Sequence, residues 1–300
     1  MHLKRKFLAS PGGMIFDVCN GAFMILFCLT IIFPVWDMLV MSFAAPRDIS
    51  FTSLNLWPKN IVLQAYTYCF ANPKFFTAYL VSISRALSGT AYHILVTVMA
   101  AFVLTRTEMP FRKTLTLIWL IPMFFGGGLI PTYLHFRNIG LTNNYLVYIL
   151  PMAFSMYTAI IVRNFFYSLD HALEESAIID GASALQVLFH IYLPLSKPVL
   201  ATITLWSLVN HWNAWFDNMI YVTTEKLLTL QYLLRRIIME AELFASDAAA
   251  FAMTQNTEFI INSETIKAAT TVLIVVPIIA VYPFLQRYFV KGIMIGAVKG

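Results

Sequence analysis

Charged residues are scarce in this chain of 300 residues, at 12% against about 25% in an average soluble domain. Hydrophobic residues make up 59% of the sequence, and the mean hydropathy is +0.73. These values exclude an ordinary soluble globular protein and predict an integral membrane protein. The net charge of +5 comes from scattered basic residues that flank apolar runs, which is typical of topology signals and not of a nucleic-acid-binding surface.

Motifs for catalysis and metal binding are also missing. The three cysteines, Cys19, Cys28 and Cys69, form no CxxC pair, and none of the six histidines has metal-ligand spacing to another histidine or a cysteine. The glycine run at 126–128 lacks the following lysine of a phosphate-binding GxxxxGK[ST] loop. The sequence therefore predicts no metal, no cofactor in this chain and no enzymatic activity of its own.

Long apolar runs dominate what is present. A helix needs about 20 apolar residues to cross about 30 Å of hydrocarbon. Stretches of this kind cover residues 21–43, 86–104, 114–134, 141–162, 198–222 and 268–286. We expect an all-α membrane protein in which residues 1–300 form a single transmembrane domain of six spans. Prolines in or beside these spans favour kinked helices around a cavity. The first run is too long for the apolar core of a signal peptide, so a retained span is favoured over a cleaved one.

Lysine and arginine indicate the orientation, because positive loops stay in the cytoplasm. With the N-terminus inside, eleven basic residues lie on the cytoplasmic side and eight lie outside. The cluster of Arg106, Arg112 and Lys113 in the shortest clear loop favours the same orientation. We therefore expect both termini and the loop 163–197 in the cytoplasm, and the loop 223–267 outside.

The loop 163–197 is acidic at its leading edge. Asp170 can cap a helix whose first turn carries Glu174 and Glu175, where the positive end of the helix dipole favours acids. Gly181 is expected to end this helix, because glycine accepts a left-handed cap without steric cost. The pattern predicts a short helix followed by a glycine turn.

A second short helix follows in the same loop. Ser183 and Gln186 have the spacing of a capping box, and Pro194 and Pro198 stop the helix and begin the fifth span. Apolar residues at helical spacing give each helix an apolar face: Leu173, Ala177 and Ile178 in the first, and Leu185, Leu188 and Phe189 in the second. An acidic, amphipathic helix-turn-helix predicts a surface that docks a protein. The alternative is a hairpin lying on the lipid surface, although such helices are typically rich in lysine and arginine.

The spacing in this loop resembles a known motif. Glu175-Ser176-Ala177, three residues, Gly181, nine residues, Ile191, one residue and Leu193-Pro194 resemble the EAA loop of permease subunits in ATP-binding-cassette importers. Only Ser176 departs from the pattern, where the motif has alanine. The ending Gly292-Ile-Met-Ile-Gly-Ala-Val-Lys-Gly300 is similar to that of carbohydrate-importer permeases of the maltose type. The resemblance covers essentially the whole chain.

The resemblance implies a half-transporter that works with other proteins. In that family, two permease subunits, usually different, form the pathway. Two ATPase subunits bind ATP and Mg, and a soluble extracytoplasmic binding protein delivers the sugar. It implies a multi-pass protein of the bacterial cytoplasmic (inner) membrane that works by alternating access. The residues that it assigns to ATPase coupling are Glu174, Glu175, Ser176, Ala177, Asp180, Gly181, Ile191, Leu193 and Pro194.

Polar and aromatic residues in the fifth span suggest a substrate pathway. Asn210, Asn213 and Asp217 recur at helical spacing, and Trp212 and Trp215 offer planar surfaces of the kind that stack on sugar rings. An ionised aspartate at mid-membrane costs at least about 2.5 kcal/mol, so it should face a cavity or the interface. The alternative is an aromatic belt with a solvated acid at the outer headgroups.

Two further segments bear on function. Arg85 lies near an end of the second span, so its side chain is expected to snorkel to the interface rather than take part in a proton relay with His93. His211 is expected to make a hydrogen bond between helices. The external segment 226–267 has leucines and isoleucines at helical intervals, which favours a helix at the outer mouth, and the resemblance implies contact with the binding protein.

The nature of the substrate rests on the resemblance alone. The region around Asn72-Pro73 and the segment 231–242 are similar to permeases whose relatives carry uronate-containing oligosaccharides. This implies an acidic oligosaccharide, such as an alginate or aldouronate fragment. A stand-alone secondary transporter or channel, and a scaffold without transport activity, remain as other functions. Copurification with a nucleotide-binding subunit separates the importer from the stand-alone transporter. A scaffold predicts that substitutions at Trp215 and Asp217 leave sugar uptake unchanged.

Overall fold

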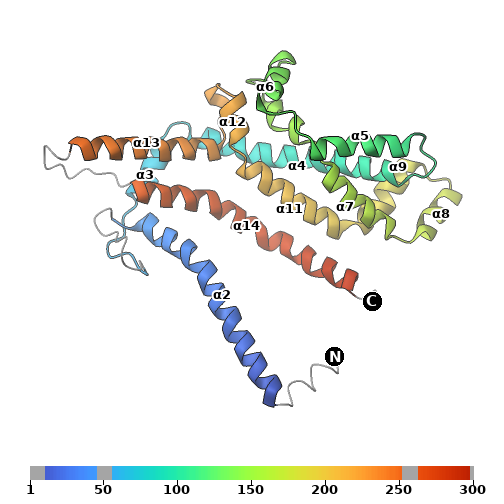
Figure 1. Ribbon diagram of the computed structural model, residues 1–300, viewed down its shortest axis with the longest axis horizontal. Helices are drawn as coiled ribbons and strands as arrows, with labels where there is room; N and C mark the ends of the chain where they lie inside the picture. Colours follow the sequence, from blue (N-terminus) through green and yellow to red (C-terminus); the bar gives the residue numbers. More distant parts are fainter. Residues whose placement is uncertain (1–10, 46–55, 252–262, 298–300) are drawn as a thin grey trace. The chain divides into compact units, whose positions relative to one another are not determined.

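The computed structural model describes residues 11–45, 56–251 and 263–297. Within these ranges the chain is helical, apart from loops and one isolated bridge between Ala44 and Ile61 (Figure 1). This confirms the all-α fold class. The elements are α2 (Pro11–Phe43), α3 (Gln64–Ala71), α4 (Phe75–Thr105), α5 (Arg112–Phe124), α6 (Leu129–Asn138), η2 (Tyr145–Tyr148), η3 (Leu150–Met152), α7 (Met156–Tyr167), α8 (His171–Ile179), α9 (Ala184–Val187), η4 (Leu188–Tyr192), α10 (Leu193–Leu195), α11 (Lys197–Asn213), α12 (Phe216–Tyr221), η5 (Glu225–Leu227), α13 (Leu230–Phe251) and α14 (Ser263–Ala297).

The chain divides into two compact units. Unit 1 comprises Met1–Ala71 and Ile237–Leu273, and unit 2 comprises Asn72–Arg236 and Ile274–Gly300. Helices α13 and α14 therefore contribute to both units. The prediction of one domain with six spans stays a prediction, and part of the external loop 223–267 and the last residues of the C-terminal motif lie outside the described residues.

Three described helices are long and apolar enough to cross a membrane by themselves: Gly12–Phe43, Phe75–Thr105 and Glu264–Val281. Three pairs of helices reach the same length and hydropathy only together, and each pair is sharply bent. The bends are 117° between α5 and α6, 50° between the segment 145–152 and α7, and 83° between the segment 184–195 and α11. Counting each pair as one span gives up to six spans among the described residues.

Proline and glycine explain these bends. Gly128 adopts φ +81° at the break between α5 and α6, where a side chain would be strained. Pro151 lies just before the second bend, and Pro194 and Pro198 flank the third. Such breaks are tolerated at membrane depth where protein or water satisfies the freed backbone groups.

Helix α4 forms the centre of unit 2 and packs against α11 and α7 (Figure 1). Its buried face carries small side chains, including Ala78, Ala86, Gly89 and Ala101. Small residues allow helix backbones to approach closely in a membrane, where the hydrophobic effect does not drive helices together. At Gly89 a Cβ atom would lie 2.4 Å from the ring of His211 on α11, so any other residue here would require the helices or the ring to shift.

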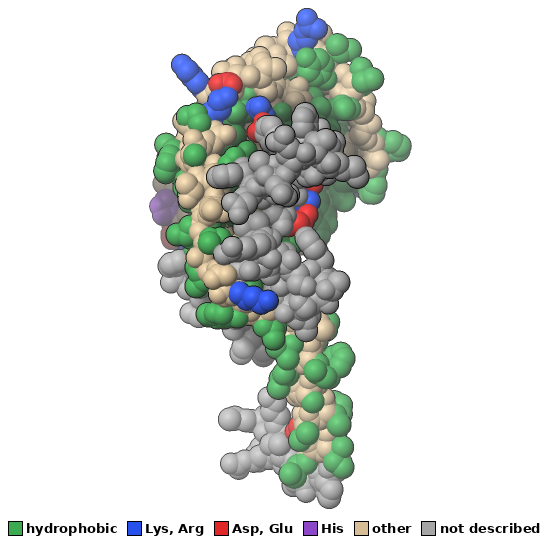
Figure 2. Space-filling model, turned by 90° about the vertical axis from the view of Figure 1, so that its left-hand side faces the viewer, with side chains coloured by type: hydrophobic (Ala, Val, Ile, Leu, Met, Phe, Trp, Pro, Cys, Tyr) green, Lys and Arg blue, Asp and Glu red, His purple; other side chains and the backbone are tan. Residues whose placement is uncertain are grey.

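In unit 1, the end of α2 packs against the segment that follows it. The backbone N–H of Val62 donates to Phe43 O at 2.8 Å, and the Tyr66 hydroxyl donates to Ser42 Oγ at the same distance. Most apolar side chains of α2 remain exposed in the isolated chain, as Figure 2 shows at the bottom of its view. An apolar helix of this length with so little buried surface requires lipid or another protein around it.

Candidate functional site

The loop between α7 and α11 folds as the sequence predicts. The Asp170 carboxylate caps α8 by accepting from the Ala172 N–H at 3.0 Å. Gly181 ends α8 with φ +84°. The N–H of Gly181 donates to Ile178 O at 3.0 Å, and the N–H of Ala182 donates to Ala177 O at 2.9 Å. This pair of bonds is a Schellman motif, which satisfies the last carbonyls of the helix.

The second helix also begins as predicted. Ser183 Oγ accepts from the Gln186 N–H at 3.4 Å, and Gln186 Oε1 accepts from the Ser183 N–H at 2.7 Å, which completes a capping box. Residues Leu188–Tyr192 then form a π-helical turn ahead of Pro194. Proline lacks an N–H and its ring crowds the carbonyl four residues earlier, so a widened turn fits at this point.

Glu174 fixes α8 to the body of unit 2. The residue is buried, and its side chain forms an ion pair with Arg106, just beyond the end of α4. The Tyr192 hydroxyl donates to the other carboxylate oxygen at 2.5 Å. Burial alone would raise the pKa of Glu174, but the hydrogen bonds from Arg106 and Tyr192 and the charge of Arg106 hold it below its ordinary value of 4.5. Glu174 therefore stays ionised at neutral pH.

Aromatic rings complete this attachment. The Arg106 guanidinium lies 4.0 Å from the centroid of the Phe102 ring and 5.7 Å from that of Tyr192. Burial and the bond to Glu174 raise the pKa of Tyr192 to about 12, so its hydroxyl remains a donor. The loop also enters the main apolar core, in which these side chains pack together: Val98, Ala101, Phe102, Val162, Phe166, Val187, Leu188, Tyr192, Val199 and Ile203.

The opposite side of the loop is exposed and apolar. Ile179 is 85% exposed, and Leu173, Ile178, Leu185 and Phe189 are each about half exposed. Among the acids, Glu175 and Asp180 are exposed and make no ion pair within the described part of the chain. A shallow groove of about 260 Å³ lies beside this surface, lined by Ala177, Ala182, Gln186, Val187, His190 and Ile191. A rigidly attached loop with an uncovered apolar and acidic face is suited to bind a protein.

One detail of the predicted faces is wrong. Leu188 does not lie on the same side as Leu185 and Phe189, because it is 1% exposed and belongs to the core, whereas those two are exposed. The widened turn that starts at Leu188 breaks the regular helical spacing on which the expectation rested.

A second cluster lies at the break between α11 and α12. Arg85 on α4 is fully buried, and both of its terminal nitrogens bind the Asp217 carboxylate. Its Nη1 also donates to Ala214 O at 3.0 Å, and its guanidinium lies 4.5 Å from the centroid of the Tyr148 ring. The Asp217 side chain is 19% exposed. The buried arginine therefore neutralises the charge of Asp217, whereas part of the Asp217 carboxylate remains accessible.

The expectation that Arg85 snorkels is wrong. A signal was present in the sequence, because Ser82, Arg85, Gly89 and His93 recur at three- and four-residue spacing and so share one face of α4. All four are buried in the structure. A stripe of small and polar residues on an apolar helix indicates a face turned toward other helices.

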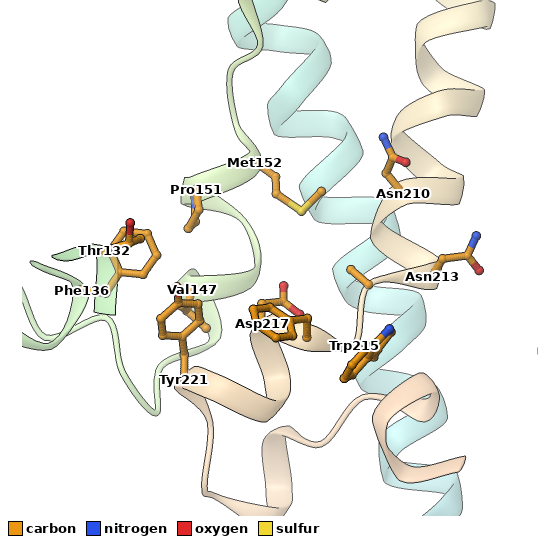
Figure 3. A pocket seen from close by; sticks show the side chains of 12 residues that line it. Thr132, Phe136, Val147, Pro151, Met152, Asn210, Asn213, Trp215, Asp217 and Tyr221 are labelled. Carbon is orange, nitrogen blue, oxygen red and sulfur yellow. The ribbon is translucent and has the colours of Figure 1, made fainter. Parts of the chain in front are cut away.

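The space beside Asp217 is a cavity of about 460 Å³ (Figure 3). Four of the residues predicted for the substrate pathway line it: Asn210, Asn213, Trp215 and Asp217. The other lining residues come from α6, η2, η3, α12 and the break before α12: Thr132, Phe136, Val147, Pro151, Met152, Ala214, Phe216 and Tyr221. This combination of apolar rings with a few amides and one acid is typical of a small-molecule site.

Trp212, the fifth predicted residue, lies elsewhere. It is 7% exposed, its indole N–H donates to Ile274 O at 3.1 Å, and its ring packs edge-on against Tyr79. It therefore contributes to helix packing and not to the cavity wall. Whether a substrate passes the other four residues stays a prediction.

The buried histidines pack between helices. His93 Nδ1 lies 3.1 Å from Met152 O, and its Nε2 lies within 3.5 Å of the hydroxyls of Thr97 and Thr158. For His211, the expected hydrogen bond between helices is not seen at Nδ1, which has no partner among the described residues. The described residues also contain no group of three or more side chains suited to bind a metal ion.

These features agree with the comparisons to known proteins. The family described as "Binding-protein-dependent transport system inner membrane component" matches residues 75–295. The match covers both the loop and the cavity. The chain therefore belongs to this family of transporter permeases.

Individual relatives narrow the comparison. Protein LplC of Bacillus subtilis (strain 168) is 38% identical over 97% of this chain and 97% of its own length. The polygalacturonan/rhamnogalacturonan transport system permease protein YtcP of the same organism is 33% identical over 95% of this chain and 99% of its own length. A chain in the crystal structure of a bacterial ABC transporter that imports the acidic polysaccharide alginate matches with a TM-score of 0.81 and 30% identity. That match covers 93% of this chain and 98% of the other.

Proposed function

We propose that this chain is one permease subunit of an ATP-driven, binding-protein-dependent importer of oligosaccharides. It forms half of the pathway together with a second, non-identical permease subunit. Two ATPase subunits bind ATP and Mg, and a soluble binding protein delivers the substrate. The chain lies in the cytoplasmic membrane of a bacterium with both termini in the cytoplasm.

The loop between α7 and α11 carries this proposal. One side of it is locked to α4 by Glu174 and by the core, whereas the other side presents Ile179, Glu175 and Asp180 uncovered. A force applied to the exposed side would therefore move α4 and α11. Helix α11 lines the cavity, and Arg85 of α4 binds the lining residue Asp217. ATP can shift the transporter between two states only through a partner that binds those states with different affinity, and a swing from 1:99 to 99:1 takes about 5.5 kcal/mol. A loosely attached loop could not transmit that energy.

The substrate class follows from the relatives and the cavity together. Relatives named for polygalacturonan/rhamnogalacturonan and for alginate transport point to acidic oligosaccharides. A cavity of about 460 Å³ with amides, an acid and aromatic rings has the size and chemistry for part of an oligosaccharide. Both permease subunits would contribute walls to the complete pathway.

Copurification tests the proposal directly. The tagged chain is expressed with its partner subunits, and the ATPase subunit that elutes with it is quantified. Changing Glu175→Arg or Ile179→Asp should release most of the ATPase, because both side chains lie on the uncovered face. Glu225→Gln is the matched control, because Glu225 is an exposed acid in a loop expected outside the cell. Transport that proceeds in the absence of ATP and of any ATPase subunit would instead support a stand-alone transporter.

A further inference from the structure

An arginine lies against the cavity wall and has no acidic partner among the described residues. The Arg235 guanidinium, on α13, lies 3.8 Å from the centroid of the Trp215 ring. Trp215 lines the cavity, so Arg235 is placed beside the cavity although it does not line it. The Arg235 side chain is exposed, and no ion pair joins it to an acid in the ranges that the structure describes.

The start of α13 is fixed to the cavity wall, so this placement is not that of a loose surface side chain. The backbone N–H of Leu230 donates to Ser82 Oγ on α4 at 2.8 Å. The N–H of Thr229 donates to Asn218 Oδ1 at 2.8 Å. Gln231 Nε2 also lies 3.4 Å from Asn213 Oδ1, a lining residue. These contacts hold the first turns of α13 to α4, α11 and α12.

The charges beside the cavity are unequal. Asp217 is the only acid among the described residues that line the cavity, and Arg85 neutralises its charge. Arg235 keeps its charge unpaired within the described residues. Arg85 and Asp217 cancel each other, so Arg235 adds one uncompensated positive charge to this group, which favours an anionic ligand over a neutral one.

We propose that Arg235 and Trp215 form a subsite that recognises the carboxylate of a uronate residue in the oligosaccharide. A guanidinium held over the face of an indole ring still has N–H donors in its own plane, which a carboxylate can bind in a bidentate pair. The indole gives Arg235 a fixed orientation through the cation–π contact and offers apolar surface to the sugar ring. This subsite rests on the proposed function, because it assigns a specificity role within the same cavity.

Binding to the purified transporter complex, without the soluble receptor, tests the subsite. Saturation-transfer NMR is titrated with trigalacturonate and with its carboxyl-reduced, neutral counterpart. Arg235→Gln should weaken trigalacturonate binding about tenfold, or about 1.4 kcal/mol, and leave binding of the neutral trisaccharide unchanged. Arg235→Lys should give an intermediate affinity for trigalacturonate, because lysine keeps the positive charge and lacks the paired N–H donors of the guanidinium. Arg236→Gln is the matched control, because it removes the same charge at the next residue, which is neither a lining residue nor stacked on Trp215.

The outcomes separate the subsite from the proposed function. The subsite is overturned if Arg235→Gln leaves trigalacturonate binding unchanged, or if it weakens both trisaccharides or acts no more strongly than Arg236→Gln. ATP-dependent uptake into proteoliposomes is measured on the same wild-type complex with its receptor. Uptake that persists while the Arg235 effect is absent rejects only the subsite. A wild-type complex that takes up no oligosaccharide with ATP rejects the proposed function and the subsite together.

Discussion

The adjacent acids Glu174 and Glu175 allow a sharp test of how the loop is attached. Glu174 is buried and paired with Arg106, whereas Glu175 is exposed. Glu174→Gln removes the charge from the buried position and keeps the shape of the side chain. The Arg106 guanidinium then loses its only ionic partner among the described residues, and its Nε and Nη2 atoms already have no hydrogen-bond partner there.

The magnitude follows from the burial of this pair. Removing one partner costs about 3–5 kcal/mol in a fully buried pair and about 0–1 kcal/mol in an exposed one. The two side chains are 28% exposed for Arg106 and 11% exposed for Glu174, so the pair lies between these limits but nearer the buried one. We expect Glu174→Gln to cost about 2–3 kcal/mol, which corresponds to a fall in Tm of about 5 °C or more.

Thermal unfolding of the purified complex and copurification of the ATPase together form the assay. Glu174→Gln should lower Tm, whereas Glu175→Gln should leave Tm unchanged and reduce the amount of ATPase that copurifies. The double variant Glu174→Gln with Arg106→Gln should lose less stability than the two single variants lose when their losses are added, because both changes remove the same ion pair. Equal Tm values for the two single glutamate variants, or strictly additive losses in the double variant, would refute the reasoning.

Three further outcomes follow from the same structure. The pKa of Glu174 lies below 4.5 in the folded chain, so the ionised carboxylate stabilises the fold fully above about pH 4.5. This stabilisation is lost as pH falls through the folded pKa, and the Tm values of wild type and Glu174→Gln should therefore converge in acid. Gly89→Ala should cost about 1–3 kcal/mol because its Cβ would meet His211 at 2.4 Å, whereas Gly21→Ala, with nothing within 4 Å, should leave Tm unchanged. Asp217→Leu should lower Tm strongly, because it leaves the buried charge of Arg85 without its partner. Adding Arg85→Met should restore most of the lost Tm, which thermal unfolding of both variants would measure.

The helix caps in the loop could be predicted from the sequence, because each cap depends only on residues a few positions apart. Asp170, Gly181, and the pair Ser183 and Gln186 each adopt the cap that their spacing predicts. The Glu174 pair was not predicted, because Arg106 lies 68 positions away in sequence and only the packing of α4 against the loop brings the two together.

The cavity illustrates the same limit. The spacing of Asn210, Asn213 and Asp217 placed them on one face, and all three line the cavity. Helical spacing could not separate Trp212 from Trp215, because the helix breaks between them: α11 ends at Asn213 and α12 begins at Phe216. The break turns Trp215 toward the cavity, whereas Trp212 remains packed against Tyr79.

Cross-linking at Ile179 tests the central claim most directly, because this residue is 85% exposed at the end of α8. The three native cysteines are replaced by serine, and Ile179→Cys is introduced, with Lys226→Cys in the loop expected outside the cell as the control. The account predicts that a short bifunctional reagent joins Ile179→Cys, and not Lys226→Cys, to the ATPase subunit in inside-out vesicles. Labelling of Ile179→Cys by an impermeant maleimide from the cell exterior, with no cross-link to an ATPase, would contradict it.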